Sequence, residues 1–555
     1  MTSEEPQEEF SIHWIRDLVD KVLERDPEEY KIVTGKSMSG SVHIGFMKEL
    51  IIADVIKREL QALGKKAKSV FIADDFDPIR AFPPSLTLSP DEYMGVPYSD
   101  APDPHGCCES LSAHWINEIV ETFPEFGVDP EVVSQSKLYE TKEMLDAVRI
   151  CLNHTQTIRD ILIEYVARDF DEKQKAEYIE SMKTWYPASV ICPECGRLQS
   201  GGKGSIVPNR VTAYNPETDE ISYKCAHCGH SETAKFDKLR LKLSWRVDWP
   251  AKWYVMKTTV EPAGKDHSVK GGSYDTGLEM SQRVFGWSGP VKVPFEWVRD
   301  GGRDMGTSKG VVFTPREWLK IAPPELFRYM VLRTDPEKAN NIQTTLIPDL
   351  VDIYETFERT FYGLDDTDSE KQDFARVLYP NTEVRPVSNE YVPKLSFKFA
   401  TVTSQLQGIL SEETVLERCY EVLKKQHNLT EISLEAKALI PIRLSRSLAW
   451  VNEFGSEQER VEVPEKVSPE IIATFTDADR RFLARLVETL GGESLEEDDI
   501  QAAIFNTARA VDVKPKRAFQ LLYMILISRK SGPRLGPFLL LLGSDWVLER
   551  IRSVL

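Results

Sequence analysis

Near its N-terminus the chain alternates short apolar runs with longer stretches in which apolar residues recur every three or four positions. Such alternation predicts strands separated by helices, because a buried parallel strand is continuously apolar whereas an amphipathic helix carries one apolar stripe. We expect helices over 12–24 and from Met47 to about Leu63. This order predicts a doubly wound α/β fold, whose ligands bind beyond the carboxyl ends of the strands. The strands are expected over 30–33, 69–73, 253–256 and 291–296.

The rest of the chain departs from this alternation. Residues from about 96 to 250 interrupt the α/β pattern and contain a long helical segment, 142–165. From Pro315 onward nearly every segment has the period of a helix, and charged linkers occur at 365–368 and 457–466. A chain of 555 residues exceeds one compact core, so we expect two or three domains, with an all-α domain over roughly the last 170 residues.

The composition is that of a globular protein, with 41% apolar and 28% charged residues and a formal net charge of −19. No apolar run is long enough to span a membrane, and the acidic start of the chain is unlike a secretory signal. We therefore expect a cytoplasmic protein without a membrane partner.

An acidic protein needs a local basic patch to bind a polyanion. One such patch lies between residues 505 and 535, which contain seven basic residues and a single acidic one, Asp512. The pattern indicates either a nucleic-acid contact or a solvated helix face. The basic residues are Arg509, Lys514, Lys516, Arg517, Arg529, Lys530 and Arg534.

Two short loops carry the strongest functional signal. The first loop, 39–46, contains His43. It lies between an expected strand and an expected helix. A helix N-terminus has unpaired N–H groups and partial positive charge, so this loop suits a nucleotide phosphate. The second, 305–310, has Gly, Ser and Lys residues and can bring an ammonium group to the same phosphates. Either loop alone is equally consistent with an ordinary glycine turn.

Two CxxC pairs indicate a metal site. Cys192 and Cys195 form one pair, and Cys225 and Cys228 form the other. Four thiolates in this arrangement close a tetrahedral zinc site, which is structural because no position is left open. Two disulfides are the alternative, but the chain shows no sign of an oxidising compartment.

A second cluster is less regular. A four-ligand zinc site would use one carboxylate, two neighbouring thiols and one imidazole. The alternative is two buried thiols beside a surface histidine. The candidate ligands are Asp103, Cys107, Cys108 and His114.

Taken together, the two loops are similar to the HIGH and KMSKS signatures of class I aminoacyl-tRNA synthetases. With the cysteine pairs added, the chain resembles class I lysyl-tRNA synthetases, found mainly in archaea and some bacteria, over nearly all 555 residues. The stretch 245–250 is also similar to glutamyl-tRNA synthetases. The stretches that carry the resemblance are 74–80, 102–107, 243–250, 264–267, 271–275 and 532–536.

The resemblance implies an ATP-dependent ligase, with magnesium as the ATP complex, that activates L-lysine and transfers it to tRNA(Lys). The alternatives are a glutamate-type class I synthetase and a non-translating relative that binds tRNA or other RNA. No oligomeric state is predicted. The implied domains are a Rossmann-type catalytic domain at 1–95 and 250–315, a zinc-binding insertion at 96–249, a helical stem-contact linker at 316–385 and an α-helical anticodon-binding domain at 386–555.

The resemblance also implies roles for individual residues, with His43 and Lys309 as the catalytic pair. A substrate ammonium needs a carboxylate or an aromatic face, which Asp75, Asp77, Asp266 or Trp245 offers. The implied ATP-binding residues are Ser39, Gly40, His43, Gly45, Gly271, Gly272, Met305, Ser308 and Lys309. The implied lysine-binding residues are Gly35, Ser37, Asp75, Trp245, Asp266 and His267. The implied tRNA-binding residues are Lys516, Arg517 and Arg534.

The chain departs from the family pattern in its signature loops. Phe46 stands in place of the final histidine of the first loop, and Met38 in place of a proline. Asp304 and Thr307 stand where the second loop usually has two lysines. Lys309 is therefore the residue of this loop that can neutralise phosphate charge. In the second metal cluster, Cys108 replaces an expected histidine, and a thiolate can replace an imidazole on zinc.

Overall fold

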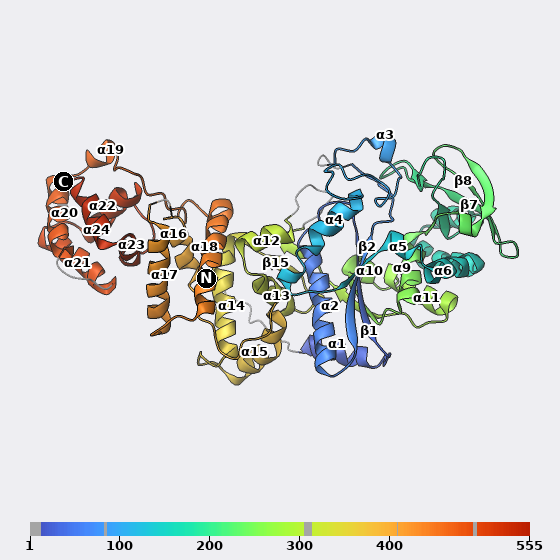
Figure 1. The fold of residues 1–555 in the computed structure, drawn as a ribbon, viewed down its shortest axis with the longest axis horizontal. Helices are drawn as coiled ribbons and strands as arrows, with labels where there is room; N and C mark the ends of the chain where they lie inside the picture. The colour runs from blue at the N-terminus through green and yellow to red at the C-terminus, as the bar shows by residue number, and fades with distance from the viewer. Residues whose placement is uncertain (1–12, 83–85, 305–312, 408, 492–496) are drawn as a thin grey trace. The chain divides into compact units, whose positions relative to one another are not determined.

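The computed structural model describes residues 13–82, 86–304, 313–407, 409–491 and 497–555 (Figure 1). The chain forms two compact units. The N-terminal unit comprises Met1–Trp318, Pro324–Ile342 and Asp366–Val387. The C-terminal unit comprises Leu319–Pro323, Gln343–Asp365 and Ser388–Leu555.

A five-stranded, all-parallel sheet forms the centre of the N-terminal unit. Its order, β12-β11-β1-β2-β3, places β1 in the middle with β11 on one side and β2 on the other. Ile32 of β1 is in register with Val260 of β11, and Lys36 with Ala73 of β2. This sheet confirms the predicted doubly wound α/β fold. The strands are β1 (Tyr30–Ser37), β2 (Ala67–Asp74), β3 (Glu131–Ser134), β11 (Val260–Gly264) and β12 (Val291–Phe295).

The connection from β1 to β2 is helix α2 (Gly45–Ala62), which packs against both strands. Most of the helix is buried, and even Lys48 and Asp54 are fully buried on it. A helix of this kind is surrounded by protein rather than lying at a surface. The loop before α2 is therefore held at the carboxyl end of β1.

Three sequence expectations need correction. Residues 253–256 are the last turn of a helix, α9 (Trp245–Met256), and not a strand, because Trp249 and Trp253 lie one helical turn apart and both turn toward Glu261. The strand beside β1 is β11, which carries a proline and a glycine and was not expected. Strand β3 comes from inside the stretch assigned to an insertion, so the insertion is not continuous over 96–249.

The remaining elements of the N-terminal unit surround this sheet. Residues 142–165 form two helices that meet at His154. The helices of this unit are α1 (His13–Leu23), α3 (Pro90–Tyr93), α4 (Leu111–Val120), α5 (Gln135–Leu138), α6 (Lys142–Asn153), α7 (Thr155–Val166), α8 (Glu172–Met182), α10 (Lys265–Ser268), α11 (Ser273–Phe285), α12 (Pro315–Ile321, ending in the other unit), α13 (Pro324–Leu332) and α15 (Ser369–Thr382). The further strands are β4 (Ala188–Val190), β5 (Gln199–Ser200), β6 (Val207–Pro208), β7 (Arg210–Asn215), β8 (Glu220–Lys224), β9 (Ser231–Lys235), β10 (Leu241–Leu243), β13 (Val298–Asp300), β14 (Arg303–Asp304) and β15 (Asn340–Ile342).

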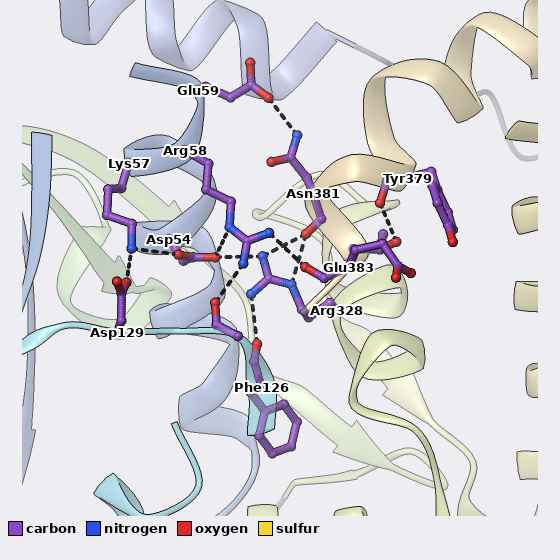
Figure 2. A network of polar contacts seen from close by, with 12 residues as sticks. Asp54, Lys57, Arg58, Glu59, Phe126, Asp129, Arg328, Tyr379, Asn381 and Glu383 are labelled. Carbon is purple, nitrogen blue, oxygen red and sulfur yellow. Dashed lines mark hydrogen bonds and ion pairs between the residues drawn. The ribbon is translucent and has the colours of Figure 1, made fainter. Parts of the chain in front are cut away.

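A buried polar network joins α2 to α13 and the end of α15 (Figure 2). Arg328 of α13 lies 2.7 Å from the Asp54 carboxylate and donates to the carbonyls of Asn381 and Phe126. Arg58 and Lys57 also contact Asp54. Burial raises the pKa of Asp54, but these three cations outweigh burial and hold the pKa below its usual value.

The C-terminal unit is all helical among its described residues, as predicted. A large apolar core extends from Leu406 to Val554, and a smaller one holds Cys419. No described helix of the chain is long and apolar enough to cross a membrane. The helices of this unit are α14 (Ile347–Phe361), α16 (Phe397–Ser404), α17 (Glu412–His427), α18 (Leu434–Phe454), α19 (Pro469–Ile472), α20 (Asp477–Leu490), α21 (Glu497–Ala510), α22 (Pro515–Ile527), α23 (Leu535–Leu542) and α24 (Ser544–Arg552).

Candidate active site

A cavity of about 450 Å³ opens at the carboxyl ends of β1, β2, β11 and β12. This is the position at which open parallel sheets bind their ligands. Ionisable and aromatic side chains make up most of its polar wall. They are Lys36, His43, Glu49, Asp74, Asp77, Arg80, Trp245, Asp248, Trp249, Lys252, Glu261, His267 and Trp297.

His43 lies in the loop before α2, and its ring packs against Gly45. A Cβ atom on residue 45 would lie 2.8 Å from His43 Nδ1, so the ring can occupy this place only beside a glycine. The Nδ1 atom is buried and has no hydrogen-bond partner among the described residues. Burial, and next the charge of Lys36, lower the pKa of His43 to about 4. The imidazole is therefore neutral at neutral pH and acts as a hydrogen-bonding group rather than a cation.

Glu49 extends from α2 into the same cavity, one turn after the loop. One carboxylate oxygen accepts a hydrogen bond of 3.1 Å from the Gly35 N–H. No described cation lies within ion-pair distance of this carboxylate. Burial raises the pKa of Glu49 to about 8, although the Gly35 hydrogen bond and Lys36 act in the opposite direction. Glu49 is thus a buried carboxylate that lacks a bound cation.

The aspartates of the cavity are already paired with lysines. Lys252 lies 2.5 Å from Asp74 and 3.5 Å from Asp248, and Lys242 lies 3.3 Å from both Asp77 and Asp248. Burial raises the pKa of Asp248, but the two lysines outweigh burial and hold the pKa below its usual value. This network fixes α9 against the end of β2 and leaves little charge for a ligand.

Aromatic rings form the opposite wall. The His267 ring lies 5.7 Å from the Trp245 ring and 5.5 Å from the Trp249 ring, and its Nδ1 atom lies 2.9 Å from the Ser273 hydroxyl. Trp249 donates to Glu261 over 2.7 Å. Trp245 is 44% exposed, so its ring is available to a ligand.

The structure brings together six of the residues that the sequence assigns to ATP or lysine binding. Asp77, offered as a partner for the substrate ammonium, also lines the cavity but is paired with Lys242. Asp75 does not reach the cavity, because its carboxylate accepts hydrogen bonds from Ser134 and Ser136. Asp266 is exposed and does not line it either. The residues in place are Gly35, Ser37, His43, Gly45, Trp245 and His267.

The remaining predicted ATP residues lie elsewhere. Ser39 and Gly40 belong to the first loop outside the cavity wall, and Gly271 and Gly272 precede α11. The Gly271 N–H donates to Asp275, and the Arg168 guanidinium lies against this glycine. Met305, Ser308 and Lys309 lie outside the described residues.

Sequence reasoning missed Glu49 and the pair of Asp248 and Lys252. A signal existed for both. Glu49 is an acidic residue between apolar positions of the helix directly after the His43 loop, and Asp248 and Lys252 are spaced one helical turn apart.

The four CxxC thiols lie together next to the small sheet β7-β8-β9. Their sulfur atoms are all within 4.8 Å of one another, with Cys192 and Cys228 3.6 Å apart and Cys195 and Cys225 3.7 Å apart. This donor set and spacing fit a tetrahedral metal ion.

The second cluster also comes together. Cys107 Sγ lies 3.1 Å from His114 Nδ1, 3.2 Å from Asp103 and 3.5 Å from Cys108 Sγ. The Asp103 carboxylate accepts backbone N–H bonds from residues 105, 107 and 108, which shape the loop around it. His105 stacks on His114 at 4.6 Å. Two thiols, a carboxylate and an imidazole within 4.8 Å fit one metal ion.

The three predicted tRNA-binding residues differ in their surroundings. Lys516 is exposed at the first turn of α22, and Arg534 is exposed at the start of α23. Arg517 instead pairs with Asp479 at 2.8 Å and donates to the Thr474 carbonyl. Asp479 belongs to the capping box of α20, so Arg517 holds two helices together.

Comparison with known proteins places these features in a family. Residues 12–382 match the family model described as tRNA synthetases class I (K), and residues 453–555 match one described as an anticodon binding domain. The chain is 32% identical over 549 residues to a protein named lysine--tRNA ligase from Methanocaldococcus jannaschii, covering 97% of this chain and 99% of the relative. Proteins of the same name from Methanosphaera stadtmanae (32% identical, 98% and 99% covered) and Archaeoglobus fulgidus (31% identical, 98% and 100% covered) are similar over the same span. The chain belongs to the class I (K) tRNA synthetases.

Proposed function

We propose that this chain is a lysine–tRNA ligase. It joins L-lysine to AMP, releasing pyrophosphate, and then transfers the lysyl group to tRNA(Lys). Near-full-length similarity to relatives that bear this name supports the assignment, and so does the substrate-sized cavity with its unpaired carboxylate. The reaction uses ATP with Mg²⁺.

Glu49 is the residue that we assign to the substrate side-chain ammonium. Two acidic groups of the cavity, Glu49 and Glu261, have no ion pair among the described residues, whereas Asp74, Asp77 and Asp248 each have a lysine. Both carboxylate oxygens of Glu261 already accept hydrogen bonds from the Trp249 and Trp253 indoles, so Glu49 is the one with an oxygen left for a substrate ammonium. A buried carboxylate gains most from a partner that restores its lost hydration. The indole of Trp245 and the ring of His267 supply an apolar and polarizable wall for the methylene chain.

The activation step needs positioning and charge neutralisation rather than a nucleophilic residue. An oxygen of the lysine carboxylate attacks the α-phosphorus of ATP, and the bond to pyrophosphate breaks. The neutral His43 imidazole donates a hydrogen bond toward the phosphate oxygens at the N-terminus of α2. Lys309 of the second loop is assigned to the leaving phosphates by its sequence alone.

Zinc is proposed at the two cysteine clusters. Cys192, Cys195, Cys225 and Cys228 would hold a structural ion that closes the β7-β8-β9 sheet against the unit. Asp103, Cys107, Cys108 and His114 would hold a second ion at the entrance to α4.

The C-terminal unit is proposed to bind the anticodon end of the tRNA, and its match to an anticodon binding domain supports this. Exposed Lys516 and Arg534 are the candidate phosphate contacts. The residues that we assign to ATP and lysine all lie in the N-terminal unit or its second loop, so the two tasks are separable. A cytoplasmic location follows from this role in translation.

The test is ATP–pyrophosphate exchange with each of the twenty amino acids. Lysine alone should support efficient exchange. Exchange driven by glutamate would favour the glutamate-type alternative, and no exchange with any amino acid would favour a non-translating RNA-binding relative. Lys309→Ala should lower lysine-dependent exchange by about tenfold or more, because it removes a charge aimed at the phosphates.

A further inference from the structure

Lys36 is a cavity residue for which neither the sequence motifs nor the proposed mechanism accounts. It lies at the carboxyl end of β1, beside Gly35, and its side chain lines the cavity. The position is set by the central strand of the sheet, paired with Ala73 of β2. A lysine in the second-last position of a buried strand is costly unless its ammonium group finds an anion.

No such anion is in place. The Lys36 ammonium group has no hydrogen bond and no ion pair among the described residues, whereas Lys252 in the same cavity contacts both Asp74 and Asp248. Arg80, another cation of the cavity wall, is exposed, whereas Lys36 is half-buried. Burial lowers the pKa of Lys36, and the charge of Glu49 opposes this effect.

Lys36 influences the pKa of the residues at both ends of the proposed reaction site, His43 and Glu49. Its charge lowers the pKa of His43, and it also acts on the pKa of Glu49 against the effect of burial. In the proposed function, Glu49 holds the lysine side-chain ammonium and His43 meets the phosphates. The α-carboxylate of the substrate must lie between these two ends, because it is the atom group that attacks the phosphate.

Resting on that proposed function, we propose that Lys36 binds the α-carboxylate of the amino acid substrate and directs it toward the α-phosphate of ATP. The reacting carboxylate and phosphate are both anions and repel each other. The neutral imidazole of His43 cannot offset this repulsion, and the second loop has Thr307 where the family pattern has a lysine. An ammonium group between the two anions supplies the missing positive charge.

The first experiment separates the carboxylate from the rest of the substrate. Calorimetry measures the dissociation constants of L-lysine and L-lysinamide, which lacks the carboxylate, for the full chain and for K36M. We expect K36M to weaken L-lysine binding by about tenfold or more, the scale of a lost charged hydrogen bond, and to leave lysinamide unchanged or tighter. Equal loss for both ligands would mean that Lys36 only supports the structure and would overturn the proposal.

The second experiment measures pyrophosphate exchange. K36M should lower kcat/KM for lysine, K36R should restore part of it, and K31M should match the wild type, because Lys31 lies on the same strand away from the cavity. Faster exchange in K36M would identify Lys36 as an internal competitor for Glu49 and overturn the proposal, as would unchanged exchange. Absence of lysine-dependent exchange in the wild type would instead overturn the proposed function itself.

Discussion

The Arg328 guanidinium and the Asp54 carboxylate lie 2.7 Å apart, and both side chains are almost completely excluded from solvent. Because Asp54 is on the helix that begins at the His43 loop and Arg328 is on α13, this pair fixes the position of α2 against the chain that follows the second loop (Figure 2). Loss of Arg328 is costly, because Asp54 loses one of its three cations and the buried carbonyls of Asn381 and Phe126 lose their donor.

We therefore predict that Arg328→Met destabilises the N-terminal unit by about 3–5 kcal/mol. Thermal or denaturant unfolding measures the loss. The matched control is Arg316→Met, because the pair of Arg316 and Glu121 is also short, at 2.5 Å, but largely exposed. The control should cost about 1 kcal/mol or less. Equal effects of the two substitutions would contradict the role of burial.

The affinity for lysine should rise with pH up to about 8. The Glu49 carboxyl, with a pKa raised to about 8 by burial, is protonated in the free protein at lower pH, so binding of an ammonium group must first release that proton. Calorimetry at pH 7 in buffers of different ionisation enthalpy should detect release of close to one proton. Glu49→Gln should bind lysine weakly and without this pH dependence. An affinity for lysine independent of pH between 6 and 8 contradicts the assignment of Glu49.

Gly45→Ala should impair catalysis without unfolding the protein. The added Cβ would lie 2.8 Å from His43 Nδ1 and displace the ring, while alanine in a helix is favourable for stability. We expect kcat for exchange to fall by about tenfold to a hundredfold, close to the effect of His43→Ala. In the His43→Ala background, Gly45→Ala should add little. Additive losses would show that Gly45 acts through something other than the imidazole.

Metal analysis should find about two zinc ions per chain. Cys192→Ser and Cys107→Ser should each remove one, because the two donor sets share no residue. Cys192→Ser should also destabilise the protein, since the free energy of metal binding at a closed structural site contributes directly to the free energy of folding. One ion in the wild type, lost in Cys192→Ser and kept in Cys107→Ser, would eliminate the second site.

Lys516→Glu should weaken tRNA binding and make the binding constant depend less on salt concentration. One phosphate contact is lost, so fewer counterions are released when the tRNA binds. Lysine-dependent pyrophosphate exchange should stay normal. Arg517→Glu serves as the contrast: it places a carboxylate against Asp479 and should lower the melting temperature. A loss of exchange in Lys516→Glu at unchanged stability would contradict the separation of the two tasks.

The fold could be predicted where local pattern and final environment agree. The apolar run at β2 and the helical period of α2 match a buried strand and a buried helix. Strand β11 could not be found in this way, because its proline and glycine weaken the strand signal and only pairing with β1 and β12 makes it a strand. The Trp-rich stretch beside it is equally compatible with an apolar strand, and the two indole contacts to Glu261 become visible only in three dimensions.

Part of the candidate site could likewise be predicted from the sequence, and part could not. The cysteine clusters follow from residue type and spacing, because four thiols in two closely spaced pairs are typical of a metal site. The carboxylate for the substrate could not be chosen from sequence, since Asp75 follows an expected strand and Glu49 follows the His43 loop, and either position can face the ligand. Which one is free depends on neighbours distant in the chain, the serines 134 and 136 for Asp75 and the Gly35 backbone for Glu49.

The central position of β1 has a consequence for synthesis on the ribosome. Its partner β11 lies more than two hundred residues later in the chain, with Ile32 opposite Val260. At elongation rates of about 5–20 residues per second, β1 waits for roughly 10–50 s with one apolar edge unpaired. During that interval the nascent chain exposes a strand edge that can pair with other chains. Assembly of the catalytic sheet is therefore limited by translation, and chaperones that shield the first hundred residues should raise the yield of active protein.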